Sequence, residues 1–267
     1  MRSSLSLLLG VCLAVGAGLS NRAAANPAVD AHYAVQTMGV DLGRAALRLD
    51  KLTDGLATKF RFETDALLGL VEASDTRMQS ESAVARDVVS PRTFEGVYQK
   101  EDRTREVGMA YGAKGEIDRF QLVKRGKVRI DHVPQGLAPD TLDPLAAFLR
   151  ARAWLGHAPE GAELVLAVFD GRKRYDASLR YLGLTQLAGD QDTAPAHRVA
   201  VRYLLVEALN EDSGVLELEA ANRPRELELA VSADGRFVPL RVEGSLDGVP
   251  ISAVLAADCA GPGACPD

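Results

Sequence analysis

Apolar and polar residues alternate with a period of two along most of the chain, which is the pattern of strands with one buried face. Four Asp-Gly pairs, at 54–55, 170–171, 234–235 and 247–248, separate such runs and favour tight hairpin turns. Besides the strands that flank the first and last of these turns, strands are predicted near 32–40, 67–72, 75–84, 94–100, 104–111, 117–124, 128–133, 163–169, 172–183, 197–209, 215–221 and 225–232.

So many strands joined by short turns predict a particular class of fold. Successive strands should pair antiparallel, and a sheet of this size curls instead of staying flat. We therefore expect an all-β, mainly antiparallel protein whose sheet is strongly curved into a barrel, a half-barrel or a β-spiral.

One segment breaks the alternation and predicts a helix near 143–155. Asp143-Pro144 suits the start of a helix, and Gly156 can end it. We expect Arg150 and Arg152 to face water, and the side that faces the sheet to be formed by Leu145, Phe148, Leu149 and Trp154. This helix either packs as ordinary core or plugs the curved sheet.

The first 25 residues have the layout of a secretory signal peptide. Arg2 precedes an apolar stretch over 5–15, and small residues lead to Ala25. The apolar stretch is shorter than the ~20 residues that span a bilayer, which favours cleavage after Ala25 over a membrane anchor. No later segment has the length and apolarity to span a membrane. We expect a periplasmic protein in which 26–256 form a single curved β-sheet domain and 257–267 form a tail.

Composition and charge narrow the class further. Of 267 residues, 47% are hydrophobic and 25% are charged, enough apolar residues for a globular core. Cleavage would remove Arg2 and Arg22 and leave 29 basic and 37 acidic side chains, a net charge of -8. This charge argues against nucleic acid as a partner.

Two of the three cysteines, Cys259 and Cys265, lie in the tail around a Gly-Pro-Gly turn. In an oxidising compartment this spacing favours a local disulfide, and two free thiols on a frayed tail are the alternative.

The sequence contains none of the common catalytic motifs, whether a nucleophile elbow, a zinc-protease helix or a phosphate loop. The four histidines are scattered, so no metal site is predicted, and no cofactor is implied. A hydrolase would need paired carboxylates, for which the candidates are Asp131, Asp170 and Asp176. Because Asp170 is already explained as a turn residue, we predict no catalytic residue and no enzymatic activity.

Two groups of residues are candidates for binding. Apolar side chains fill the interior if the sheet closes tightly, and line a groove for an acyl chain or apolar peptide if it stays wider. The candidates for such a ligand site are Phe60, Phe62, Phe148, Trp154, Phe169 and Tyr181. A basic cluster, Arg172-Lys173-Arg174, is either a solvated hairpin end or a contact for lipid phosphates or an acidic partner protein.

Four segments, in order along the chain, resemble a bacterial family of exported proteins known as the domain of unknown function 3108 family. They are the segments 76–83 (TRMQSESA), 143–152 (DPLAAFLRAR), 169–176 (FDGRKRYD) and 238–244 (VPLRVEG). The resemblance implies a β-rich periplasmic domain without an established activity, and no catalytic residue can be carried over. More distantly, the layout resembles the periplasmic β-spiral envelope-integrity proteins and the half-barrels of lipoprotein carriers.

These observations favour a non-enzymatic protein of cell-envelope maintenance, which binds an apolar ligand, such as a lipid or acyl chain, or a protein partner in its curved sheet. The alternative is a structural scaffold with a solid core that docks to an envelope assembly through its edge strands.

Overall fold

The fold is taken from a computed structural model of the chain, and the residues that it describes are 29–64, 73–85, 88–100, 102–188, 193–218, 224–246 and 249–260. The predicted signal peptide, the predicted strand at 67–72, the Asp-Gly pair at 247–248 and Cys265 lie outside the described residues. The predicted division of the chain at 25 and 256, and the disulfide of Cys259, therefore stay predictions.

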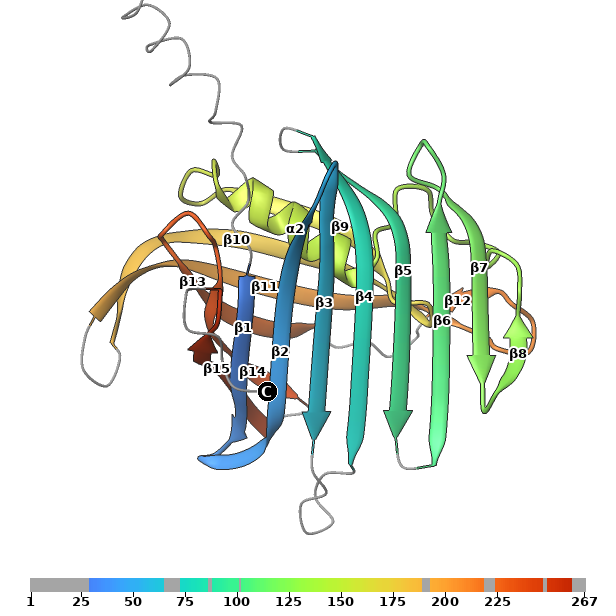
Figure 1. The fold of residues 1–267 in the computed structure, drawn as a ribbon, viewed down its shortest axis with the longest axis horizontal. Helices are drawn as coiled ribbons and strands as arrows, with labels where there is room; N and C mark the ends of the chain where they lie inside the picture. The colour runs from blue at the N-terminus through green and yellow to red at the C-terminus, as the bar shows by residue number, and fades with distance from the viewer. Residues whose placement is uncertain are drawn as a thin grey trace, which may run out of the picture.

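The described strands form one curved sheet of 15 strands whose paired neighbours are antiparallel. The front wall in Figure 1 consists of β1 (Val29–Thr37), β2 (Val40–Leu52), β3 (Gly55–Thr64), β4 (Ser74–Ala85), β5 (Val88–Lys100), β6 (Arg103–Tyr111), β7 (Ile117–Lys124) and β8 (Lys127–Ile130). The back wall consists of β9 (Glu163–Phe169), β10 (Lys173–Ala188), β11 (Thr193–Leu209), β12 (Leu216–Leu218), β13 (Arg225–Ser232), β14 (Pro239–Leu246) and β15 (Val249–Asp258). This confirms the predicted all-β class and the strong curvature.

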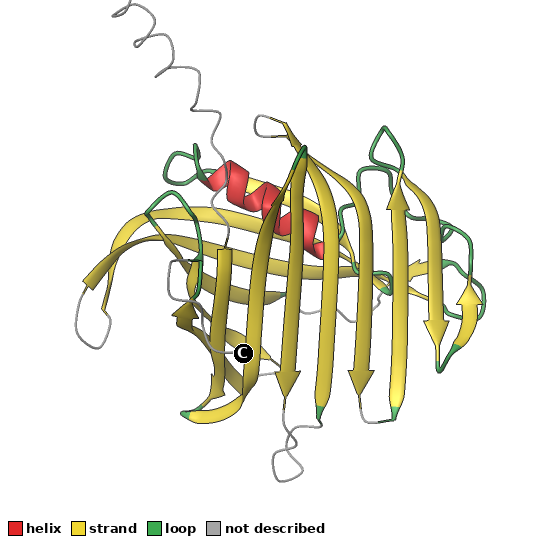
Figure 2. Cartoon of the chain, viewed as in Figure 1, coloured by secondary structure: helices red, strands yellow, loops and turns green. Residues whose placement is uncertain are grey.

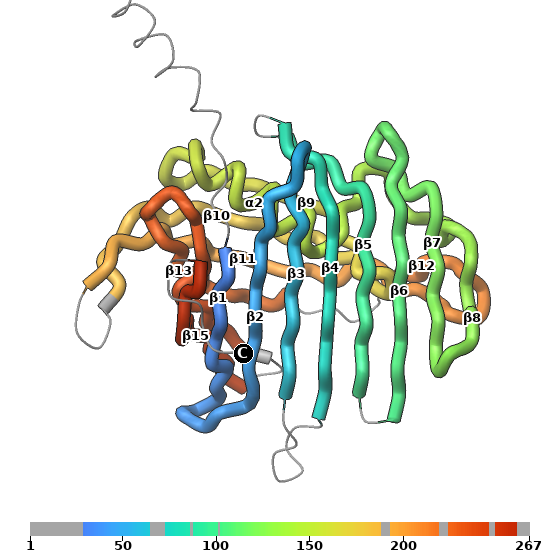
Figure 3. Tube along the Cα trace, viewed as in Figure 1, coloured from blue at the N-terminus to red at the C-terminus, as the bar shows by residue number. Residues whose placement is uncertain are grey.

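The two walls are joined through β1, which pairs with β2 on one side and with β15 on the other. Figure 3 shows this seam, where the first and last strands lie side by side. From the seam the sheet runs to β8 at one end and to β9 at the other, and these two ends do not pair with each other. The sheet is therefore curved but not closed.

Short turns join successive strands, as the Asp-Gly pairs predict. The described Asp-Gly pairs lie at turns between successive strands, as predicted. They are 54–55 between β2 and β3, 170–171 between β9 and β10, and 234–235 between β13 and β14. One turn differs from the prediction, because 32–40 was expected to be a single strand. The chain instead turns at Met38 and Gly39, which both have positive φ values of 47° and 80°. Two such residues are what a tight hairpin between β1 and β2 needs.

The predicted helix is α2 (Pro144–Leu155), which begins after the cap residue Asp143 and ends at Gly156. Figure 2 shows it between the two walls, and it contacts β3, β4 and β5 of the front wall and β9 of the back wall. The helix contributes side chains to all three clusters of the hydrophobic core. It therefore fills part of the inside of the curve and holds the walls together.

Arg152 was expected to face water, but the helix buries it to 6% exposure. Its Nε donates a hydrogen bond of 2.8 Å to the backbone oxygen of Arg236, in the turn after β13. This distant carbonyl satisfies one buried donor of the guanidinium, while Nη2 has no hydrogen-bond partner among the described residues.

Both ends of the sheet are partly protected from pairing with another chain. At β9, Leu142 forms a parallel bridge with Val168, with hydrogen bonds of 2.9 and 2.8 Å to the strand backbone. At the other end, β8 is only four residues long and exposes Lys127 and Arg129. Short and charged edge strands discourage association with other sheets.

Candidate functional site

The inner face of the curved sheet changes character with distance from α2. Close to the helix, Leu49, Phe94 and Val168 are buried, with exposures of at most 2%. Farther away, inward-pointing apolar side chains from both walls are only half-buried. We call this set the open inner face, and it consists of Phe60, Phe62, Met78, Leu227 and Leu229.

At one end of the open inner face, the turn between β9 and β10 reaches across to the front wall. The hydroxyl of Tyr98 on β5 donates a hydrogen bond of 3.1 Å to the backbone oxygen of Asp170. The guanidinium of Arg172 lies 4.4 Å from the centre of the Tyr98 ring, which is cation–π geometry. A Cβ on Gly171, whose φ is +86°, would lie 2.2 Å from Cγ1 of Val107. Only glycine lets this turn approach the front wall so closely.

Two more tyrosines extend this contact along the back wall. The rings of Tyr175 and Tyr203 meet edge to face, with centres 5.9 Å apart and planes at 76°. Burial raises the pKa of Tyr98, Tyr175 and Tyr203, so all three hydroxyls stay protonated near neutral pH. We call Tyr98, Arg172, Tyr175 and Tyr203 the Tyr98 cluster. It offers neutral hydroxyl groups and one cation beside an apolar surface.

A group of ion pairs stands next to the Tyr98 cluster on the front wall. Arg105 is the cross-strand neighbour of both Tyr98 and Lys124. The carboxylate of Glu211, in the loop after β11, pairs with the Arg105 guanidinium and lies 2.6 Å from Nζ of Lys124. Burial raises the pKa of Glu211, but its hydrogen bond with Lys124 and the charge of Arg105 outweigh burial and lower it. Glu211 is therefore ionised and links the two walls at this end.

The predicted ligand residues occupy different environments. Phe169 is fully buried and Tyr181 is 7% exposed, so both belong to the core. Phe148 and Trp154 are half-buried against core clusters. Of the six predicted residues, the structure brings Phe60 and Phe62 together on the open inner face.

The three residues of the predicted basic cluster also lie in different environments. Arg174 forms ion pairs with Asp176 at 3.0 Å and Glu207 at 3.8 Å, while Lys173 is exposed. Arg172 alone belongs to the Tyr98 cluster. Sequence reasoning did not single out Tyr98, Tyr203 or Arg105. Counting alternate positions along their strands would have placed them on the inner face, although not next to the Asp-Gly turn.

Asp143 is the one fully buried carboxylate of the described residues. Its Oδ1 accepts hydrogen bonds of 2.9 Å from the backbone N–H groups of Leu145 and Ala146, and Ser80 Oγ lies 3.2 Å from its Oδ2. Burial raises the pKa of Asp143 to about 6, against the opposing effect of these hydrogen bonds. The group is explained by its role as helix cap.

The carboxylates considered for a hydrolase have separate partners. Asp170 accepts the backbone N–H groups of Arg172 and Lys173, Asp176 pairs with Arg174, and Asp131 lies 3.6 Å from His132. No contact between the described residues joins any two of these carboxylates. Within the same residues, no group of three or more histidine, cysteine or acidic side chains is arranged to hold a metal ion.

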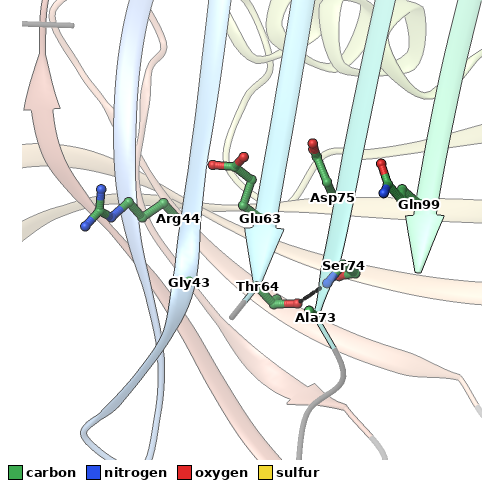
Figure 4. A pocket seen from close by; sticks show the side chains of 8 residues that line it. All are labelled: Gly43, Arg44, Glu63, Thr64, Ala73, Ser74, Asp75 and Gln99. Carbon is green, nitrogen blue, oxygen red and sulfur yellow. Dashed lines mark hydrogen bonds between the residues drawn. The ribbon is translucent and has the colours of Figure 1, made fainter. Parts of the chain in front are cut away.

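A hollow of about 550 Å³ lies at the ends of β2 to β5 away from the helix, and Figure 4 shows the side chains that line it. Arg44, Glu63, Asp75 and Gln99 form its charged and polar side. Burial raises the pKa of Asp75, but hydrogen bonds from Arg77 and Arg61 outweigh it and lower the pKa. An ionised, paired carboxylate is unsuited to donate a proton, so this hollow has the character of a hydrated charged surface.

The fold has known counterparts, although no curated protein matches the sequence. The chain is similar to the beta-barrel-like protein of domain of unknown function DUF1849 from Brucella abortus, with a TM-score of 0.57 and 10% identity over 87% of this chain and 97% of that one. It also aligns with the hypothetical lipoprotein YmcC from Escherichia coli K12, with a TM-score of 0.34 and 10% identity over 91% of this chain and 94% of that one. The first similarity concerns the fold alone.

None of the helices in the described part of the chain has the length and apolarity needed to cross a membrane. The family model described as "Protein of unknown function (DUF3108)" matches residues 30–248, which is most of the chain. The chain therefore belongs to the DUF3108 family.

Proposed function

We propose that this protein is a non-enzymatic component of the bacterial periplasm that binds an apolar ligand, a lipid or an acyl chain, on the open inner face. The half-buried apolar side chains on the two walls carry the proposal. Aromatic and aliphatic groups held on a concave surface gain free energy when an apolar chain covers them, at about 25 cal/mol per Å² of apolar surface removed from water.

The position of α2 supports this assignment. The helix fills only part of the inside of the curve, where it buries the inward-pointing residues of both walls. Phe60 and Met78 pack against that core without being covered by it, and Phe62 lies on the same face of β3, two residues beyond Phe60. A ligand on these residues would continue the apolar packing that the helix begins.

The sheet edges favour a ligand on the inner face over docking through edge strands. Leu142 bridges to β9, and β8 is short and carries exposed charges. An edge that recruits a partner strand would instead present unpaired backbone groups over a longer stretch.

The proposed periplasmic location rests on the signal-peptide pattern of residues 1–25. Expression of the full chain in a bacterial host tests it by N-terminal sequencing of the periplasmic fraction, where the mature protein should begin at Asn26. A protein that stays in the cytoplasm with its first 25 residues attached would refute the proposed periplasmic location.

Lipid binding is tested on protein purified from the periplasm without detergent. Mass spectrometry of an organic extract should find lipid or fatty acid, and the delipidated protein should bind a fluorescent fatty acid. Phe62→Gln should weaken that binding by about ten-fold, because it places a polar group on the open inner face. Val165→Gln, at an exposed position of β9, is the control and should leave binding unchanged. If native protein carries no lipid and takes up no fatty acid, the proposed function is wrong.

A further inference from the structure

Arg172 carries a buried donor that no described residue satisfies. Its Nε is buried and has no hydrogen-bond partner among the described residues. The nearest carboxylate oxygen, on Asp170, is 3.7 Å from Nη2, which is beyond hydrogen-bond distance. Asp170 uses its other oxygen to accept two backbone N–H groups of the turn, each at 2.8 Å. A buried donor without a partner costs roughly 1–3 kcal/mol, so such a group favours a ligand that accepts from it.

Arg172 differs from the other two cations at this end of the inner face, because no carboxylate of the described residues lies within hydrogen-bond distance of its guanidinium. Arg105 and Lys124 share the carboxylate of Glu211, whereas Arg172 has the carboxylate of Asp170 at 3.7 Å, and the charge of the buried Asp143 also acts on Tyr98. The complete chain carries a net charge of -6. A guanidinium without a hydrogen-bonded carboxylate, on a protein that is acidic as a whole, favours a negatively charged group of a ligand at that position.

The same place combines this charge with an apolar surface. Tyr98 touches Arg172 through its ring face and packs against the core cluster that also borders Phe60 and Met78. On the other wall, Tyr175 and Tyr203 pack against the cluster that borders Leu227 and Leu229. A cation and protonated hydroxyls thus lie at one end of the open inner face, and the apolar side chains of that face lie next to them.

We propose that the ligand of the open inner face is an anionic amphiphile, a single acyl chain with a carboxylate or phosphate head that binds Arg172 while the chain lies on the apolar residues. This inference rests on the proposed function and deepens it. Arg172 presents the planar fork of donors that matches such heads, and charge-assisted hydrogen bonds are the strong ones. The hydroxyls of Tyr175 and Tyr203 are further donors from the same cluster.

Calorimetric titration with two compounds of equal chain length, lauric acid and lauryl alcohol, tests the inference. The delipidated protein should bind the acid at least ten-fold more tightly than the alcohol, because a hydrogen bond to a charged group contributes about 1.5–3 kcal/mol. Arg172→Gln should abolish this preference and leave the affinity for the alcohol unchanged. Lys173→Gln makes the same change of charge on the exposed neighbouring residue and should keep the preference.

Each other outcome has a definite meaning. Equal binding of acid and alcohol by the wild-type chain refutes the inference but leaves the proposed function standing, whereas no binding of either refutes the proposed function. Lauryl phosphate should behave like lauric acid, and inorganic phosphate should not bind, since most affinity comes from the acyl chain. Binding of inorganic phosphate as tight as that of lauryl phosphate would also refute the inference. If Arg172→Gln does not fold, as judged by circular dichroism, Arg172→Lys replaces it and should lower the preference without abolishing it.

Discussion

Replacing Asp143 by asparagine removes a buried charge and keeps the atom that caps α2. In the wild-type protein Oδ1 accepts the backbone N–H groups of Leu145 and Ala146, and an amide oxygen can accept them equally well. The amide nitrogen would donate to Ser80, whose hydroxyl oxygen lies 3.2 Å from Oδ2. The substitution therefore tests the cost of the charge separately from the value of the cap.

The magnitude follows from the pKa of Asp143, which burial raises from 3.8 to about 6. A carboxyl group whose pKa is higher in the folded state favours folding while it is protonated. This contribution is complete below about pH 4 and is lost as the pH rises through about 6, a change of about 3 kcal/mol in the free energy of unfolding. The Asp143→Asn variant stays neutral and escapes this loss.

Urea unfolding of both proteins between about pH 4 and pH 7.5 measures the effect. We expect the wild type and Asp143→Asn to be similarly stable near pH 4. Near pH 7.5 the variant should be more stable than the wild type by about 3 kcal/mol. Burial lowers the pKa of His197, whose contribution is lost as the pH falls, but the comparison at each pH removes this effect. Asp143→Ala also removes the cap, so its free energy of unfolding should be about 1–2 kcal/mol lower than that of the asparagine variant at every pH. Stability curves that run parallel for the wild type and Asp143→Asn would refute the reasoning.

Three further substitutions test contacts between the walls and along the helix. Gly171→Ala should lower the free energy of unfolding by about 2–4 kcal/mol in urea, because its Cβ would lie 2.2 Å from Val107 at a φ of +86°; a loss below 0.5 kcal/mol would contradict the described turn. Glu211→Gln should cost about 1 kcal/mol at low salt and less at high salt, because it weakens two part-exposed ion pairs, and a salt-independent cost would argue against them. Arg152→Met should be neutral or stabilising in thermal unfolding, because methionine fills the same space without a buried charge; a clear loss would mean that the hydrogen bond to Arg236 outweighs the cost of burial.

The parts of the fold that the sequence predicted depend on local chemistry. The Asp-Gly turns at 54–55, 170–171 and 234–235 use residues whose backbone preferences predict a turn. The helix also carries its own signals, a capping aspartate followed by proline and a glycine at the end. The turn at Met38 was missed, because a methionine with a positive φ gives no signal of its own.

The parts that could not be predicted depend on residues that are distant in sequence. Arg152 occupies the polar side of a helix by its spacing, but in the fold it is buried where the backbone oxygen of Arg236, 84 residues away, accepts its hydrogen bond. The contact between Tyr98 and Arg172 likewise depends on how far the sheet curls, which brings a turn of the back wall onto the front wall. Strand alternation predicts which face a side chain occupies, but not what lies opposite.

The pairing of β1 with β15 has a consequence for the order in which the molecule assembles. Ala31 has Asp258 as its cross-strand partner, so nearly all the described chain must be present before the seam can form. Closing so long a loop is slow, and until it happens one side of β1 has unpaired backbone groups. Until the seam forms, β1 can pair with strands of other unfolded chains, so aggregation before folding is complete is the hazard of this topology.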